Sequence, residues 1–199
     1  MITVNVTGVN NRRYESFSIH KNFICHYSPY FNAAFNGSFI EGETQSLDME
    51  ANPRVFSVFV NWIYSQKLEE EDIEDLDSDA QFQLWILADR LLVPKLQNAT
   101  MRLLLLNKRR PSLKRGTLQY VYENTTKGSP LRTRLVEHYT SRGSFTKPRD
   151  YENWPSEMLA DMVRVLGQSL PQTGDSLSAR NTKLEDYFVS EEIPGRNSQ

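Results

Sequence analysis

Apolar and polar residues alternate along the first part of the chain and then give way to a different spacing. Alternation over residues 2–6 and 14–19, with a polar stretch at 8–12 between them, predicts a β-hairpin with one buried face per strand. The apolar residues expected on the second strand are Tyr14, Phe17 and Ile19. A further alternating segment at 45–49 predicts a short third strand.

Elsewhere the apolar residues recur at intervals of three and four, which is the spacing of an amphipathic helix. Two helices begin at a polar residue followed by proline, Ser28-Pro29 and Asn52-Pro53, a pair suited to the first turn. Gly37 stands where a residue of positive φ is expected to end the first of them. The other predicted helices cover residues 21–27, 94–106, 118–123, 131–141 and 155–166, and one more runs from a cap at Ser78 or Asp79 to Leu92. The last one is expected to gather its apolar side chains on one face, namely Met158, Leu159, Met162, Val163 and Leu166.

The predicted order is two strands, two helices, one strand and then helices alone. This order indicates an α+β fold, with a small three-stranded sheet capped by helical hairpins and followed by a helical extension. Pro111 marks a change of pattern, so we expect a first domain at residues 1–110 and the extension at 111–170. Residues 171–199 are mostly polar apart from 187–189, and we expect a disordered tail there.

The charge of the chain is nearly balanced, with a formal net charge of −2 and a pI near 6.0. Nucleic-acid binding usually needs a broad basic surface, so no nucleic-acid partner is expected. No apolar run reaches the roughly 18 residues of a membrane span, and no secretory signal opens the chain, so we expect no membrane partner. A single cysteine, Cys25, allows no internal disulfide, which favours the cytoplasm or the nucleus.

Four motifs then occur in an order that is similar to a known family. They are SIHKNFICHYSPYF at 18–31, FIEG at 39–42, PRVFSVFVNWIY at 53–64 and LADRLLVPKL at 87–96. Over about residues 2–108 this pattern resembles the BTB/POZ domain. The stretch at 120–132 looks like the C-terminal extension that is common in filamentous-fungal BTB proteins.

The resemblance implies a protein-interaction module, and it draws attention to Phe39, Ile40 and Glu41. In the family, a hydrophobic-x-Glu triplet after the second helix helps some members to dock on cullin-3. Phe39 would then fill an apolar pocket of the partner, and Glu41 would orient the complex from the rim. The alternative is that Phe39 packs on its own domain and that Glu41 is a solvated loop charge.

The chain also departs from the family pattern near its first strand. Many members carry a strand and a helix before the hairpin and exchange them between protomers, whereas here the hairpin starts at Ile2. The aspartate that many members carry at the start of that strand is missing, so Lys21 is left as part of an incomplete charged pocket. A swapped dimer is therefore not favoured, while a monomer and a homo- or hetero-oligomer of another kind stay open.

Few residues suggest a catalytic site, a metal site or a charged binding patch. His20, Cys25 and His26 stand close together, but no protease or hydrolase motif surrounds them, and a buried thiol is the favoured interpretation. His138 is remote from them in the sequence, and no zinc, calcium or nucleotide motif occurs. The acidic run at 69–79 is better explained as a solvated loop than as a surface for basic partners. Lys108-Arg109-Arg110 fits a helix C-terminus better than an import or nucleic-acid patch.

The sequence therefore predicts an interaction protein and not an enzyme, with no cofactor, no metal and no small-molecule substrate. The first hypothesis is a substrate adaptor for a ubiquitin ligase of the cullin-3 type. The second is a self-association or scaffold protein with no ubiquitin role, and a role linked to transcription is included in this alternative. Because a fold by itself does not give a function, both hypotheses need the geometry of the surface.

Overall fold

The computed structural model describes residues 1–8, 14–69, 72, 76, 78–106, 116–141 and 154–169. The strands are β1 (Ile2–Thr7), β2 (Tyr14–Ile19) and β3 (Ser46–Glu50). The helices of the first part are α1 (Lys21–Tyr27), α2 (Pro29–Asn36), α3 (Ile40–Thr44), α4 (Pro53–Ser65), α6 (Ser78–Arg90) and α7 (Pro94–Leu106). The later helices are α8 (Thr117–Glu123), α9 (Pro130–Ser141) and α10 (Ser156–Ser169).

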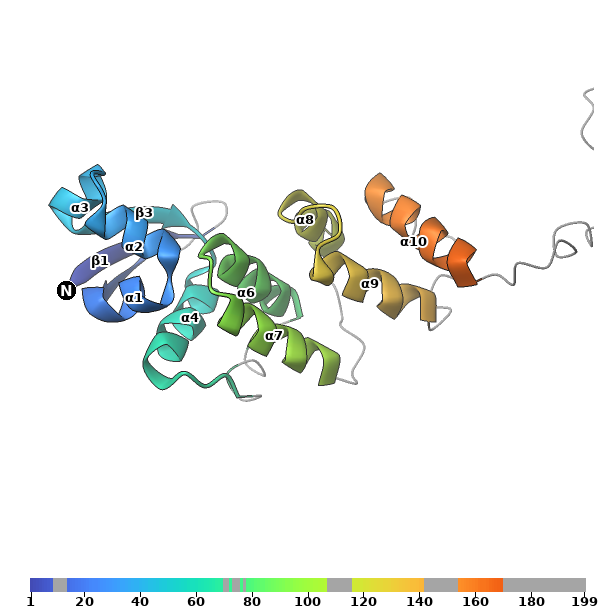
Figure 1. The fold of residues 1–199 in the computed structure, drawn as a ribbon, viewed down its shortest axis with the longest axis horizontal. Helices are drawn as coiled ribbons and strands as arrows, with labels where there is room; N and C mark the ends of the chain where they lie inside the picture. Colours follow the sequence, from blue (N-terminus) through green and yellow to red (C-terminus); the bar gives the residue numbers. More distant parts are fainter. Residues whose placement is uncertain are drawn as a thin grey trace, which may run out of the picture.

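The three strands form one sheet in the order β2-β1-β3. Strands β1 and β2 are antiparallel, with Ile2 opposite Ile19, which confirms the hairpin. Strand β3 runs parallel to β1, with Thr3 opposite Ser46. A parallel neighbour requires a long crossover, and α1, α2 and α3 supply it. The α+β fold predicted from the sequence is therefore confirmed (Figure 1).

The prediction that Tyr14, Phe17 and Ile19 form the apolar face of β2 is confirmed only in part. Ile19 is fully buried and Phe17 is half-buried, and both point toward the helices. Tyr14 lies an odd number of residues away, so the pleat turns its side chain to the other face, where it is 64% exposed.

The two capping pairs are confirmed. The Ser28 hydroxyl accepts a hydrogen bond from the Phe31 N–H at 3.3 Å, and the Asn52 side chain accepts one from the Arg54 N–H at 3.1 Å. The same Ser28 hydroxyl donates to the Leu91 carbonyl oxygen at 2.7 Å, so it also ties the start of α2 to the turn between α6 and α7.

The segment after α2 differs from the prediction in two ways. Gly37 does end α2, but its φ of −83° is not the left-handed conformation that we expected. A glycine is needed there for another reason, because a Cβ would collide with the Ala33 carbonyl oxygen. The prediction of only two helices between β2 and β3 is also wrong, since the short helix α3 follows.

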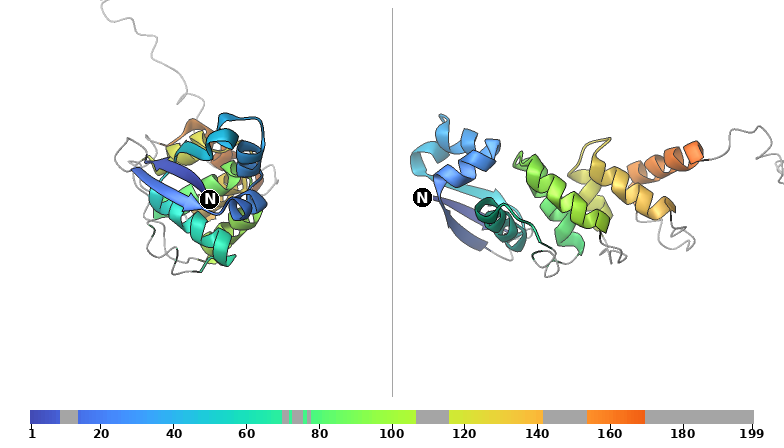
Figure 2. Two further views of the ribbon diagram at one scale, coloured as in Figure 1. Left: turned by 90° about the vertical axis from the view of Figure 1, so that its left-hand side faces the viewer. Right: turned by 60° about the horizontal axis from the view of Figure 1, so that its bottom comes forward.

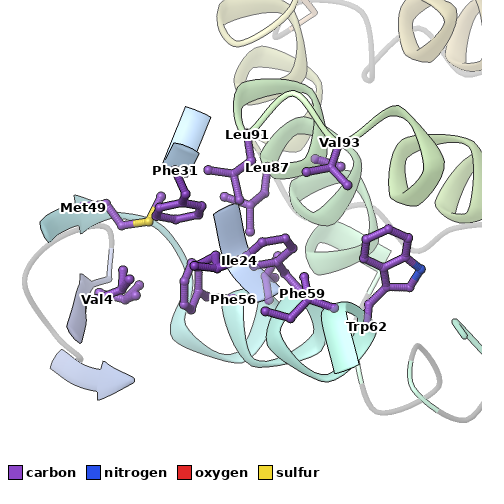
Figure 3. Packing of buried hydrophobic residues seen from close by; sticks show 14 of the residues in the cluster. Val4, Ile24, Phe31, Met49, Phe56, Phe59, Trp62, Leu87, Leu91 and Val93 are labelled. Atoms are coloured by element: carbon purple, nitrogen blue, oxygen red, sulfur yellow. The ribbon is translucent and has the colours of Figure 1, made fainter. Parts of the chain in front are cut away.

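The main hydrophobic core lies between the sheet and α4, with α1, α2 and α6 closing it (Figure 3). Three phenylalanine side chains fill its centre: Phe31 of α2 and Phe56 and Phe59 of α4, each with 0% exposure. The Phe31 and Phe59 rings are stacked, with centroids 6.1 Å apart, and Phe56 meets both at an angle. Helix α4 therefore forms the base of this domain, as its apolar spacing predicts.

A second hydrophobic core joins α6 to the extension. Phe82, Trp85 and Ile86 of α6 are buried against α8, α9 and α10, whereas Leu84 and Leu87 of the same helix belong to the main core. Figures 1 and 2 show the result, an elongated molecule with the sheet at one end and α10 near the other. The predicted boundary at Pro111, the basic residues 108–110 and the tail at 171–199 lie outside the described residues.

Helix α10 does not bury the whole apolar face that the sequence predicts. Met158 is fully buried and Met162 is 6% exposed. Leu159, Val163 and Leu166 remain exposed, with fractions of 37%, 70% and 36%. The apolar band of α10 is therefore wider than the surface that α8 and α9 cover. No helix among the described residues is long and apolar enough to span a bilayer.

Candidate functional site

The triplet singled out from the sequence lies at the beginning of α3. Phe39 is the N-cap residue, and Ile40 and Glu41 form the first turn. The side chains of Phe39 and Ile40 are 60% and 65% exposed, while Glu41 is half-buried. Phe39 therefore does not pack into its own domain, and the structure presents two neighbouring apolar side chains to solvent.

Two glycines hold this turn against the end of α2. A Cβ at Gly42 would lie 2.9 Å from the Gly37 carbonyl oxygen, and a Cβ at Gly37 would lie 3.2 Å from the Phe39 ring. The Gly42 N–H donates to the Phe39 carbonyl oxygen at 2.9 Å. The close approach fixes the direction in which the triplet leaves α2.

The end of α3 is closed by Gln45, which has a φ of 52°. Its N–H donates to the Glu41 carbonyl oxygen at 2.9 Å, and its side-chain amide donates to the Gly42 carbonyl oxygen. A non-glycine residue in the left-handed region costs roughly 1 kcal/mol, and these two bonds offset that cost. These bonds hold α3, and with it the triplet at its beginning, in a defined conformation.

The exposed apolar surface continues along α2. Tyr30 is 38% exposed, and Ala33 and Gly37 follow at intervals of three and four residues, so all of them share one face of the helix. We call Tyr30, Ala33, Gly37, Phe39 and Ile40 the α2–α3 ridge. Sequence reasoning missed the first two of these residues, although their helical spacing to Gly37 was a signal that could have found them.

Lys21, the other predicted site residue, has a structural partner. Its ammonium group donates to the Phe35 carbonyl oxygen at 2.9 Å. This carbonyl lies in the last turn of α2, where a helix leaves its acceptors unpaired and favours a positive charge. Lys21 therefore braces α1 against α2 at the position where the charged pocket was expected.

Cys25 has no features of an activated nucleophile. Its thiol is half-buried and donates a weak hydrogen bond to the Phe31 carbonyl oxygen at 3.6 Å. Burial raises the pKa of the Cys25 thiol, and the nearby Lys21 lowers it by less. The thiolate is thus disfavoured, although the thiol is only half-buried and not fully buried as the sequence interpretation expected.

His20 stabilises the start of α1 through Tyr64. Its backbone N–H donates to the Tyr64 hydroxyl at 3.1 Å, and its Nδ1 lies 2.9 Å from the same oxygen. The ring of Phe23 completes an exposed aromatic group, with its centroid 5.0 Å from that of Tyr64. His20 therefore braces the start of α1 through its contacts with Tyr64.

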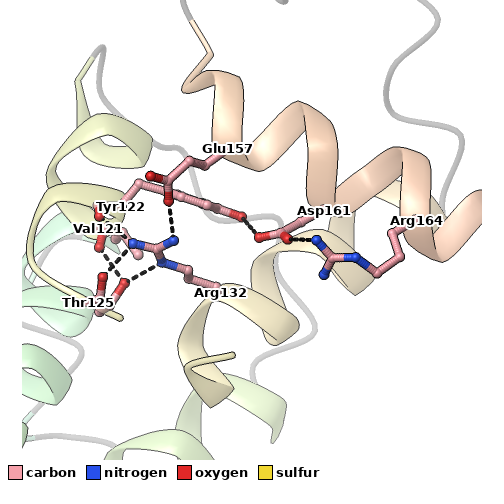
Figure 4. Close-up of polar contacts among 7 residues, drawn as sticks. All are labelled: Val121, Tyr122, Thr125, Arg132, Glu157, Asp161 and Arg164. Carbon is pink, nitrogen blue, oxygen red and sulfur yellow. Dashed lines mark hydrogen bonds and ion pairs between the residues drawn. The ribbon is translucent and has the colours of Figure 1, made fainter. Parts of the chain in front are cut away.

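A buried arginine organises the extension (Figure 4). The Arg132 guanidinium donates to the Tyr122 carbonyl oxygen at 2.5 Å, to the Thr125 hydroxyl at 2.9 Å and to the Thr125 carbonyl oxygen. It pairs with Glu157 of α10 at 2.5 Å and lies over the Tyr122 ring, 4.3 Å from its centroid. The cluster joins α8, α9 and α10.

Tyr122 links this cluster to a second carboxylate. Its hydroxyl donates to Asp161 at 3.1 Å, and Asp161 also pairs with Arg164 at 2.9 Å. Burial, and then the negative charge of Asp161, raise the pKa of the Tyr122 hydroxyl well above its usual value. The side chains of this cluster bond to one another, so we assign the cluster the structural role of holding α8, α9 and α10 together.

The described residues contain no group of three or more histidine, cysteine or acidic side chains arranged to hold a metal ion. Their exposed features instead include the apolar α2–α3 ridge and the aromatic group around Tyr64. Surfaces of this kind bind other proteins more readily than they catalyse reactions.

Comparison with known proteins agrees with this interpretation of the surface. A sequence model of the BTB/POZ domain matches residues 4–108, which is more than half of the chain. The protein therefore belongs to the BTB/POZ family, and its first domain is a protein–protein interaction module.

One solved structure similar to the chain is the BTB domain of zebrafish PATZ1. The two are 20% identical in sequence, and the similarity covers 52% of this chain and 75% of that one, with a TM-score of 0.39. A search of curated proteins found no match. The family membership thus rests on the sequence model, and the resemblance to the fungal type stays a prediction.

Proposed function

We propose that this protein is a substrate adaptor that docks on a cullin of the cullin-3 type through the α2–α3 ridge. The carrying observation is the exposure of Phe39 and Ile40, 60% and 65%, at the start of α3. The helical extension is the part that would recruit a substrate, and the cytoplasm or nucleus is the proposed location.

The chemistry of the ridge supports this role. A large apolar side chain that enters a pocket of the partner usually supplies most of the binding free energy. Phe39 is such an anchor, and the carboxylates Glu41 and Glu43 beside it would steer a basic partner surface. The ordered turn between Gly37 and Gln45 reduces the entropy lost on binding.

Co-purification with cullin-3 tests the proposal. The double variant Phe39→Ala, Glu41→Ala should weaken binding at least about tenfold, because truncation of a central anchor costs 2 kcal/mol or more. Tyr14→Ala is the matched control, since Tyr14 is 64% exposed but lies on the sheet. Undiminished cullin binding by the double variant would exclude this docking mode.

Self-association is the second candidate function. The exposed aromatic group of Phe23 and Tyr64, each 43% exposed, lies on α1 and α4, apart from the triplet on α3. Light scattering at micromolar concentration should then give a dimer that Phe23→Ser weakens. A strict monomer that also fails to bind cullin-3 would contradict both functions.

A further inference from the structure

The outer face of α10 carries three exposed aliphatic side chains. Leu159, Val163 and Leu166 stand four and three residues apart, so they share one side of the helix. With a rise of about 1.5 Å per residue, they form a stripe about 10 Å long. We call these three residues the α10 stripe.

The α10 stripe is not needed to hold α10 in place. The opposite face already buries Met158 and Met162. Glu157 and Asp161 also bind Arg132 and Tyr122 of the neighbouring helices. The stripe therefore adds exposed aliphatic surface that the fold does not use, and covering such surface is favourable.

The small size of the stripe restricts what can cover it. A stable interface between separate proteins buries about 800 Å² on each partner and involves roughly 20–30 residues a side. Three partly covered side chains provide only a small part of that area, which argues against a second copy of the chain. A segment of the same chain needs less contact, because covalent linkage raises its local concentration to about the millimolar range.

The sequence that follows α10 contains one aromatic apolar segment. It is 184–189, with Leu184 followed at three, four and five residues by Tyr187, Phe188 and Val189. Residues 170–183 connect it to Ser169, the last residue of α10. At about 3.3 Å per residue, this connection can span roughly 45 Å, which is several times the length of the stripe.

We propose that segment 184–189 packs on the α10 stripe within the same molecule, with Tyr187 and Phe188 against Val163. Apolar contact would carry the interaction, since Arg164, the neighbour of Val163 in the sequence, is already paired with Asp161. This inference goes beyond the adaptor role and does not depend on it, because α3 and α10 lie at opposite ends of the molecule (Figures 1 and 2).

Hydrogen–deuterium exchange of the full chain, followed by mass spectrometry, tests the contact. The amides of 184–189 should exchange about tenfold more slowly in the unchanged chain than in Val163→Asp, which is the ratio for a segment docked about nine-tenths of the time. Leu105→Asp is the matched control, because Leu105 is 55% exposed on α7 and should leave the exchange unchanged. Phe188→Ser should speed the exchange as Val163→Asp does, with the folded core intact.

Two results would overturn the proposal. One is equal exchange of 184–189 in all four proteins. The other is protection that grows with protein concentration, since the stripe would then be covered by a second copy. The circular dichroism melting curve of Val163→Asp should match that of the unchanged chain, and Phe188→Ser supplies the decisive comparison if it does not.

Discussion

Arg132 shows how a single buried charge is stabilised in this protein. Its side chain is 6% exposed, whereas that of its carboxylate partner Glu157 is 68% exposed. Much of its bonding is therefore to neutral oxygen atoms of Tyr122 and Thr125. Loss of the guanidinium would leave those carbonyl groups without their donor, and an unsatisfied buried acceptor is costly.

Replacing Arg132 with methionine should lower the free energy of unfolding by about 2–4 kcal/mol, because the apolar side chain fills the space but donates no hydrogen bond. Urea unfolding followed by circular dichroism measures this loss. Arg164→Met is the control, since the Arg164 side chain is 53% exposed and makes a surface pair with Asp161. That change should cost at most about 0.5 kcal/mol. Similar losses in the two variants would contradict this account of Arg132.

At the scale of elements, the junction of α2 and α3 depends on close approach of the backbone. Gly37 has an extended conformation that any residue can adopt, with a ψ of −170°. Its lack of a Cβ still matters, because the Ala33 carbonyl oxygen and the Phe39 ring occupy that space. The direction of the exposed triplet thus follows from packing between two short helices.

Gly37→Ala should lower the free energy of unfolding by about 1–3 kcal/mol, as expected when an added methyl group forces backbone atoms apart. Gly167→Ala is the opposite case, because Gly167 lies within α10 and a Cβ there meets no atom within 4 Å. That change should raise stability by about 0.5–1 kcal/mol. Thermal and urea unfolding of both variants measures the difference, and stabilisation by Gly37→Ala would refute the steric explanation.

At the scale of the whole molecule, α6 couples the BTB domain to the extension. One of its faces carries Leu84 and Leu87 into the main core. Another carries Phe82, Trp85 and Ile86 into the second core. A helix that belongs to two cores cannot unfold with one of them alone, so the two parts should behave as one cooperative unit.

Leu131→Ala tests this coupling, because Leu131 of α9 has 0% exposure in the second core. The change should cost about 2–5 kcal/mol, the usual range for such a truncation. Hydrogen exchange in low denaturant should show the same loss of protection in peptides from α4 and from α9. Loss confined to α9 would mean that the extension unfolds independently.

The features that could be predicted from the sequence are those that depend on residues close together along the chain. Ser28 and Asn52 act as caps because the bond joins residues two or three apart, so the sequence contains both partners. The triplet at Phe39 was found through a motif of three consecutive residues. Tyr30 was missed, although its spacing to Gly37 places it on the same helix face, because the exposure of that face depends on how α2 is placed against the core.

The sequence by itself determined the strands, most of the helices with their starting points, and membership of the BTB/POZ family. These features depend on residue spacing and on local hydrogen bonds. Only the tertiary structure decided that Tyr14 and Val163 face solvent, that Lys21 binds the end of α2, and that α6 serves two cores. The physical reason is that burial is set by which distant segments cover a side chain, and the periodicity of one segment does not contain that information.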